Sequence, residues 1–215
     1  MTRHTVETIP REEGESMMTK EKKLQTMIIT ALLCALGIAI PMFAPKIVIG
    51  PMSFTLASHV PIFIAMFISP PAAAAVTLVT TVGFFAAGFP LVIVLRALSH
   101  IVFAMIGAFW LKKRPASLAG LKGTAALGAV LSAVHAGCEV LVVTYFFFGN
   151  LLAKGFYSNG YVLSVLLLVG VGGFVHSMVD YSLSVAVWKP LVRTVRIPVS
   201  VKNILGAGAR HSNAA

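Results

Sequence analysis

The sequence predicts an all-α integral membrane protein with six transmembrane helices and both termini in the cytoplasm. The chain has 215 residues, of which 58% are hydrophobic and only 11% are charged. Its mean hydropathy of +0.91 lies outside the range of soluble domains. Long apolar runs alternate with short segments rich in Gly, Pro and charge, and the Lys and Arg residues are distributed unevenly among these segments.

The apolar runs divide into six candidate spans. A bilayer core of about 30 Å needs about 20 apolar residues per helix. By this measure the spans lie at 24–44, 53–69, 72–89, 91–111, 125–148 and 161–188. The second and third spans are short and contain or adjoin Pro61, Pro70 and Pro71, so we expect a bent or tilted pair there. The chain then consists of a cytoplasmic tail (1–23), a membrane domain (24–190) and a second cytoplasmic tail (191–215).

The distribution of cations predicts the orientation. With the N-terminus inside, fourteen of the 17 Lys and Arg residues lie on the cytoplasmic side, Lys46 and Lys154 lie outside, and Arg96 lies within a span. Cytoplasmic connections are enriched in Lys and Arg. We therefore expect a multi-pass protein of the cell membrane. The same rule accounts for the net charge of +10, so no nucleic-acid partner is expected.

Three pairs of polar residues interrupt the apolar spans. In each pair the second residue follows the first by four positions, so both lie on one helical face. The pairs are Arg96 with His100, His135 with Glu139, and His176 with Asp180. An Arg or Asp at the bilayer centre costs about 2.5–3.5 kcal/mol on insertion scales. The three faces should therefore point at one another or at a cavity.

Arg96 has two interpretations. It can pair with Glu139 across the helix interface, or its guanidinium can bind the carboxylate of a ligand, and a shared network would satisfy both. His176 and Asp180 are interpreted as a structural pair that fixes a tautomer and joins helices. His59 precedes Pro61, so it is either part of a helix break or a contact to a ligand.

The outer loop at 149–161 carries Asn150, Tyr157 and Tyr161. Its aromatic rings are either interfacial belt residues or part of a lid over a pocket, where they would stack on a planar ligand. In the first span, Ala31, Ala35 and Ala39 repeat every four residues. Small residues at this spacing allow another helix to approach closely, either within the protein or in a partner.

The sequence predicts neither an enzyme nor a metal protein. It contains no GxSxG, HExxH or GxxxxGK[ST] motif, so ATP hydrolysis would reside in separate subunits. The buried histidines and carboxylates suit Zn²⁺, Ni²⁺ or Co²⁺ by ligand type. However, Arg96 lies one turn from His100, and its charge would oppose a divalent cation. We therefore expect no metal and no cofactor, and a structural or proton-coupled membrane protein remains an alternative.

These features together resemble the substrate-binding S components of energy-coupling-factor (ECF) vitamin transporters. The resemblance rests on six short spans, the AxxxAxxxA first helix, the absent ATPase motif and a polar pocket toward the outside, and it covers roughly residues 24–190. It implies a prokaryotic cell membrane, a transmembrane coupling protein that docks on Ala31, Ala35 and Ala39, and two ATPase subunits.

The runs VIGPMSFTLASHVPIFIAMFISP (48–70) and GFPLVIVLRALSHIVFA (88–104) are most similar to niacin-specific members of that family. Nicotinate is a planar anion, so the resemblance implies that Arg96 holds its carboxylate while His100, His135 or Glu139 meets the ring nitrogen. His59, Asn150, Tyr157 and Tyr161 complete the expected binding residues. Pantothenate, another vitamin, or a transition metal as cargo are the alternative substrates.

Overall fold

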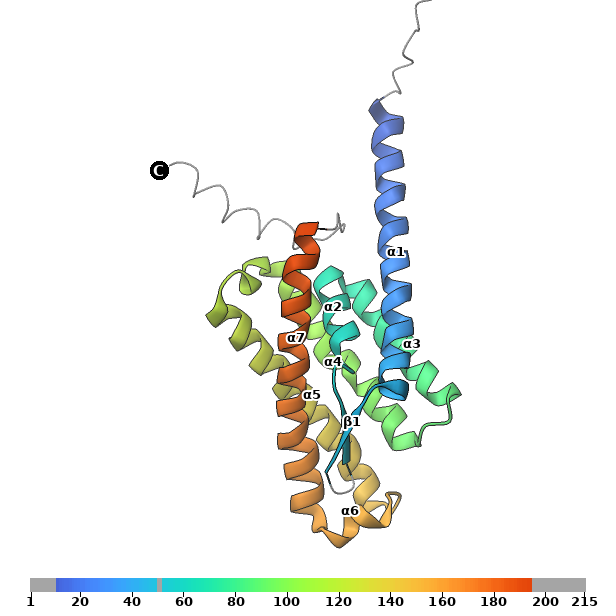
Figure 1. The fold of residues 1–215 in the computed structure, drawn as a ribbon, viewed down its shortest axis with the longest axis vertical. Coiled ribbons are helices and arrows are strands. Elements are labelled where there is room, and N and C mark those ends of the chain that lie inside the picture. The colour runs from blue at the N-terminus through green and yellow to red at the C-terminus, as the bar shows by residue number, and fades with distance from the viewer. Residues whose placement is uncertain (1–10, 50–51, 195–215) are drawn as a thin grey trace, which may run out of the picture.

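The protein is a bundle of helices with one small β-hairpin (Figure 1). The computed structural model describes residues 11–49 and 52–194. The described elements, in chain order, are α1 (Arg11–Phe43), β1 (Lys46–Ile49), β2 (Met52–Thr55), α2 (Val60–Ile68), α3 (Pro70–Ala86), α4 (Leu91–Lys113), the 3-10 helix η1 (Pro115–Leu118), α5 (Leu121–Phe148), α6 (Lys154–Ser158), the π-helical segment η2 (Val162–Val171) and α7 (Gly172–Thr194).

Four helical segments of the described chain are long and apolar enough to cross a membrane. They are Thr19–Phe43, Leu91–Lys113, Leu121–Phe148 and Val162–Val192. Helix α3 is apolar but has only 17 residues, and α2 has nine. The predicted class of helical membrane protein therefore agrees with the structure, whereas only four of the six predicted spans have the length of a full crossing.

The predicted span at 53–69 is wrong in its first half. Strands β1 and β2 pair antiparallel there, with Lys46 opposite Thr55, and helix α2 begins only at Val60. β-branched residues in β1 favour a strand, and Pro61 fits the first turn of a helix, where its missing N–H costs nothing. Helix α1 also begins earlier than predicted. Its first residue is Arg11, which lies within the segment 1–23 that was expected to be a tail.

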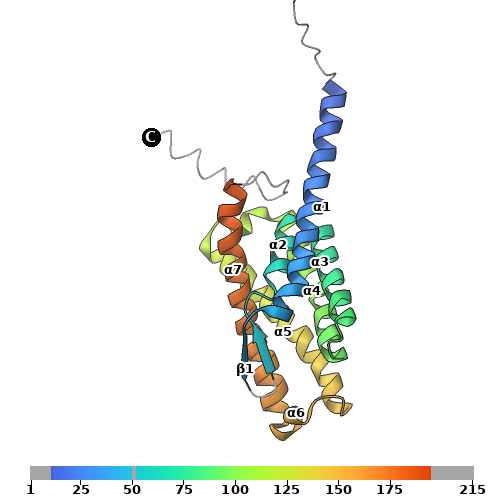
Figure 2. The ribbon, with the colours of Figure 1, turned by 45° about the vertical axis from the view of Figure 1, so that its right-hand side comes forward.

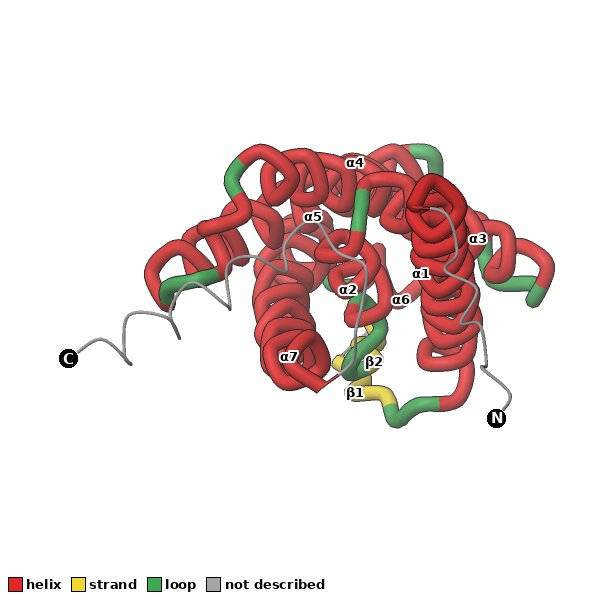
Figure 3. The backbone as a smooth tube through the Cα atoms, turned by 90° about the horizontal axis from the view of Figure 1, so that it is seen from above, coloured by secondary structure: helices red, strands yellow, loops and turns green. Residues whose placement is uncertain are grey.

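The short helix α2 lies at the centre of the bundle (Figure 3). It contacts α1, α3, α4 and α7, and every residue from Pro61 to Ile68 is buried. A helix that is apolar on all sides is stable only when protein surrounds it on all sides. Non-helical backbone at membrane depth is likewise tolerated where protein covers it. The surrounding helices thus allow the turn before α2 to carry polar groups inside the molecule.

The start of α1 and the end of α7 lie at the same end of the bundle, and the hairpin and α6 lie at the opposite end (Figures 1 and 2). Helix α1 stands at the edge, and only 11% of its apolar window is buried. It packs on α3 through Gly37, where an added Cβ would collide with the side chain of Thr80. One face of α1 therefore holds it to the bundle and leaves the rest of the helix uncovered by the described chain.

We predict that Gly128→Val destabilises the protein by about 1–3 kcal/mol, because overpacking a filled core forces side chains and backbone to shift. A Cβ at Gly128 would lie 2.5 Å from two ring carbons of Tyr181, which is itself buried. On the same helix, a Cβ at Gly137 meets nothing within 4 Å. Thermal unfolding in detergent should show a lower midpoint for Gly128→Val than for the matched control Gly137→Val. Equal midpoints would contradict this packing.

Candidate functional site

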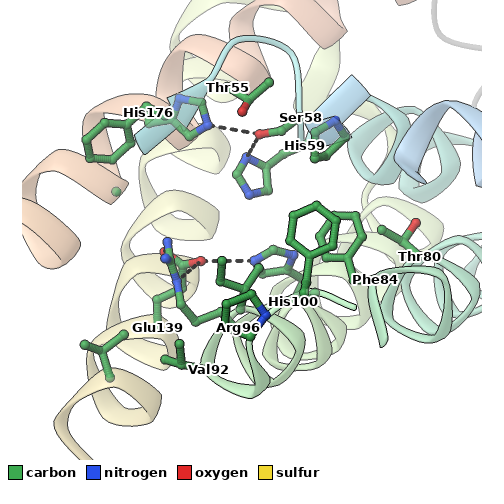
Figure 4. Close-up of a pocket in the computed structure, with 18 of the residues that line it drawn as sticks. Thr55, Ser58, His59, Thr80, Phe84, Val92, Arg96, His100, Glu139 and His176 are labelled. Atoms are coloured by element: carbon green, nitrogen blue, oxygen red, sulfur yellow. Dashed lines mark hydrogen bonds and ion pairs between the residues drawn. The ribbon is translucent and has the colours of Figure 1, made fainter. Parts of the chain in front are cut away.

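A cavity of about 390 Å³ lies between the hairpin, α3, α4, α5, α6 and α7. Its volume is within the usual range for small-molecule sites. Phenylalanine rings form much of its wall, namely Phe54, Phe84, Phe89 and Phe156. The polar side chains in the wall are Lys46, Thr55, Ser58, His59, Thr80, Arg96, His100, Glu139 and His176, several of which Figure 4 shows. An apolar, largely aromatic wall with a few converging polar groups suits a small ligand that is planar and carries charge.

Arg96 and Glu139 form a two-point ion pair in this wall. The guanidinium donates from Nε to Oε1 at 3.1 Å and from Nη2 to Oε2 at 3.0 Å. The Glu139 side chain is almost fully buried, whereas that of Arg96 remains 20% exposed. Helix α4 carries the arginine and α5 the glutamate, so the pair also joins these two helices. Of the two interpretations of Arg96, the internal pair is therefore present, and Arg96 lines the cavity as well.

Two histidines surround the same carboxylate. His100 Nε2 lies 3.3 Å from Glu139 Oε1, and His135 Nε2 lies 3.5 Å from it. The two ring nitrogens are 3.1 Å apart. His100 faces the cavity, while His135 lies behind it and is 1% exposed. The polar faces of α4 and α5 thus point at each other, as the cost of exposing them to lipid predicts.

Asp180 anchors the turn that precedes α2. Its Oδ1 accepts from the backbone N–H of Ala57 at 2.8 Å, and its Oδ2 accepts from the backbone N–H of His59 at 2.9 Å. The ring Nδ1 of His59 lies 3.0 Å from the same Oδ2. Ala57 has a φ of 65°, a conformation that only a firmly held turn imposes on alanine. Asp180 therefore has a structural role, which fixes where the His59 ring lies.

The outer loop lines the cavity, but through residues other than the three that the sequence predicted. Its wall residues are Leu151, Leu152, Ala153 and Phe156. The Tyr157 hydroxyl accepts from the Leu152 N–H at 3.0 Å, and the Tyr161 hydroxyl is 3.0 Å from Thr144 Oγ1. Asn150 is exposed at a positive φ of 55°. Among the described residues, Asn150, Tyr157 and Tyr161 are thus outside the cavity wall.

Five polar residues of the wall were not among the binding residues predicted from the sequence, namely Lys46, Thr55, Ser58, Thr80 and His176. Ser58 Oγ lies 3.1 Å from His176 Nε2, so His176 belongs to the wall as well as to its pair with Asp180. Thr80 Oγ1 is buried and has no hydrogen-bond partner in the described part of the chain. Lys46 comes from the unpredicted hairpin. Only Thr80 had a usable signal, since it lies in an apolar run where a helix face turns inward.

The fold and this cavity define a helical multi-pass membrane protein with an internal site for a small molecule. The chain is 40% identical over 199 residues to the niacin transporter NiaX of Lactococcus lactis subsp. cremoris (strain MG1363), an alignment covering 90% of this chain and 87% of that protein. The chain therefore belongs to the same family, the S components of ECF vitamin transporters, which confirms the resemblance seen in the sequence. No protein-family model matches the chain, and no solved structure matches it significantly.

We predict that Asp180→Asn lowers the free energy of unfolding by about 1–3 kcal/mol, the usual cost of leaving a buried polar group without its partner. The new amide has one acceptor oxygen, and its NH₂ group would face one of the two backbone N–H groups that Asp180 accepts. The exposed Ser182, on the same helix, serves as control through Ser182→Ala. Thermal unfolding should separate the two variants, and an unchanged midpoint in Asp180→Asn would refute the anchoring role.

Proposed function

We propose that the protein is the high-affinity niacin-binding subunit of an ECF-type importer and that the cavity binds nicotinate. The observation that carries this proposal is the position of Arg96, whose guanidinium lies in the wall of a cavity that several aromatic rings also line. The family relationship supports it, because the relative from Lactococcus lactis is a niacin transporter. Nicotinate combines a carboxylate with a flat ring, and these are the two features that the wall can recognise.

The pair with Glu139 leaves Arg96 able to bind a ligand. A guanidinium has five N–H donors, and the pair uses one on Nε and one on Nη2. The remaining donors include both on Nη1, which can hold a carboxylate that enters the cavity. Glu139 fixes the plane of the guanidinium, so little side-chain freedom is lost on binding. Lys46 in the wall adds a second positive charge for the same anion.

The remaining polar groups suit the ring nitrogen of the vitamin. Ser58, His100 and His176 line the cavity, and a hydroxyl or a neutral imidazole can donate to this nitrogen. Phe54, Phe84 and Phe156 provide ring faces and edges for the aromatic plane. Pantothenate also carries a carboxylate, but it has no flat ring to benefit from these walls. We therefore place nicotinate ahead of pantothenate as the substrate.

The six helical segments α1 to α5 and η2–α7 form the proposed membrane domain of residues 24–190, with tails at 1–23 and 191–215 in the cytoplasm. Lys20, Lys22 and Lys23 lie near the start of α1, at the end of the bundle where α7 also ends (Figure 1). Because cytoplasmic segments are rich in Lys, these residues support a cytoplasmic position for this end of the bundle. The cavity lies toward the opposite end, near the hairpin and α6. In the plasma membrane of a prokaryote the cavity would then receive the vitamin from outside.

The partners in this proposal are a transmembrane coupling protein and two ATPase subunits, which would supply the ATP hydrolysis. Ala31 and Ala35 on α1 are exposed and Ala39 is half-buried, whereas Leu33 and Cys34 face the bundle. The small-residue face is therefore not used for packing within the described chain. A surface of this kind lets a partner helix approach closely in lipid.

Saturable binding of nicotinate to the purified protein tests the proposal, and Arg96→Lys tests its central contact. We expect Arg96→Lys to weaken binding by more than about tenfold, because an ammonium cannot make a bidentate pair with a carboxylate. Arg114→Lys, the same substitution outside the cavity, should leave the affinity unchanged. Equilibrium dialysis with labelled nicotinate, and with pantothenate as competitor, gives both affinities. Failure of the wild-type protein to bind nicotinate would rule out the proposed function.

We predict that Ala35→Trp abolishes uptake and co-purification with the coupling protein while nicotinate binding persists. An indole at this exposed position blocks the close approach of a partner helix without entering the cavity. Leu36→Trp places the same ring on the next face of α1, where Leu36 is also exposed, and should leave uptake intact. A pull-down and a cellular uptake assay measure the two effects. Normal uptake by Ala35→Trp would show that partners dock elsewhere.

A further inference from the structure

Three histidine rings from different parts of the fold meet at the inner wall of the cavity. His59 precedes α2, His100 lies on α4 and His135 on α5. The ring centroid of His59 is 4.9 Å from that of His100 and 4.6 Å from that of His135. The ring centroids of His100 and His135 are 4.8 Å apart. All three residues are buried, and Glu139 follows His135 by one helical turn. This concentration of imidazoles exceeds what helix packing requires.

The ligand atoms of this cluster converge as metal ligands do. The three distances among His100 Nε2, His135 Nε2 and Glu139 Oε1 are 3.1, 3.3 and 3.5 Å. Zinc bonds of about 2.0–2.1 Å in a tetrahedron place neighbouring ligand atoms about 3.4 Å apart. With one atom of His59 included, all four ligand atoms lie within 4.8 Å of one another. Three of the four atoms are thus already at ligand spacing.

Several proton arrangements in this cluster leave lone pairs that a cation could use. A neutral imidazole has one N–H, and a carboxylate only accepts. If His135 carries its proton on Nε2 and donates to His100, then the bare Nε2 of His100 faces the Glu139 oxygen without a proton between them. If both rings carry the proton on Nε2 and donate to Glu139 Oε1, the two N–H groups lie side by side with their nitrogens 3.1 Å apart. If His135 carries its proton on Nδ1 instead, that nitrogen is buried and has no partner among the described residues. A cation between the three atoms would take their lone pairs as ligands.

His59 is oriented as a metal-bound histidine usually is. Its Nδ1 lies 3.0 Å from Asp180 Oδ2, and the carboxylate can only accept there, so this nitrogen carries the proton. The Nε2 of His59 is therefore left with a lone pair. In Figure 4 the ring lies between Ser58 and the pair formed by Glu139 and His100. A carboxylate that holds the second nitrogen of a histidine ligand is the common outer-shell arrangement of metal sites.

The charge of Arg96 does not prevent this. The sequence suggested that a guanidinium one turn from His100 would repel a divalent cation. In the structure Arg96 makes two hydrogen bonds to Glu139, so its charge is balanced within the pair. A divalent cation beside Asp180 would leave the cluster with one net positive charge. An anionic vitamin would balance it.

We propose that His59, His100, His135 and Glu139 bind a divalent transition-metal cation such as Zn²⁺ and that this cation helps to hold the anionic vitamin. The second part rests on the proposed function; the first does not. Three imidazoles and one carboxylate are the ligand types that Zn²⁺ and Co²⁺ prefer. Because His59, His100 and Glu139 line the cavity, the charge of the cation would act on an anion bound in it.

The test begins with the wild-type chain, so it does not depend on how a variant folds. Purified protein is treated with a chelator, dialysed and titrated with ZnCl₂, and its metal content is measured. We expect about one Zn²⁺ per chain and, with CoCl₂, the visible absorption of a tetrahedral Co²⁺ site. Nicotinate should bind the metal-free protein at least about tenfold more weakly than the Zn²⁺ form. If the protein binds no stoichiometric Zn²⁺ and its affinity for nicotinate is the same before and after treatment with the chelator, the metal site is refuted. The niacin proposal would still stand in that case.

Two variants locate the site. His100→Ala should reduce Zn²⁺ affinity by more than about tenfold, whereas His176→Ala removes a cavity histidine outside the four ligands and should retain Zn²⁺. The reverse result would overturn the assignment, since His59, His176 and Asp180 form the competing group. Stoichiometric Zn²⁺ with unchanged nicotinate affinity would overturn the role in holding the vitamin. Stoichiometric Zn²⁺ with no nicotinate binding in either form would support the metal site and refute the niacin proposal.

Discussion

The buried ion pair between Arg96 and Glu139 is the interaction on which the rest of the site depends. Both side chains come from helices that lipid would otherwise surround, and neither charge is stable there alone. The pair joins α4 to α5, positions the carboxylate between His100 and His135, and sets the plane of the guanidinium at the cavity wall. One neutralised pair thus makes a polar cavity compatible with an apolar bundle, and it leaves donors on Arg96 that an anion can use.

The second constraint is the anchoring of the turn before α2 by Asp180. A nine-residue helix cannot cross a membrane, so α2 is stable only because other helices enclose it. The turn that leads into it would expose its backbone N–H groups at membrane depth, and Asp180 accepts two of them. The same carboxylate orients His59 toward the cluster on α4 and α5. A structural contact from α7 therefore determines the geometry of a cavity-lining residue on another element.

Much of this arrangement could be predicted from the spacing of the polar residues along the helices and from the energetic cost of exposing them to lipid. Polar residues four positions apart in apolar helices must share a face, and the expense of exposing them to lipid predicts that the faces meet, as those of α4 and α5 do. The hairpin could not be predicted, because its apolar residues are as common in a membrane helix as in a strand. The wall residues of the outer loop were also not predicted, since the direction of Phe156 and Tyr157 depends on how the short helix α6 sits on the bundle. The pairing of Arg96 with Glu139 was one of two interpretations that the sequence left open, because spacing along one helix does not show which residue of another helix lies opposite.

A structure of the protein with bound nicotinate would show whether the polar cluster around Arg96 is a vitamin-binding site. We expect the vitamin in the cavity between the α4–α5 pair and Phe156, with its carboxylate within hydrogen-bonding distance of the Arg96 guanidinium and Arg96 still paired with Glu139. A vitamin bound elsewhere in the protein, or bound in the cavity without contact to Arg96, would refute the proposed role of Arg96.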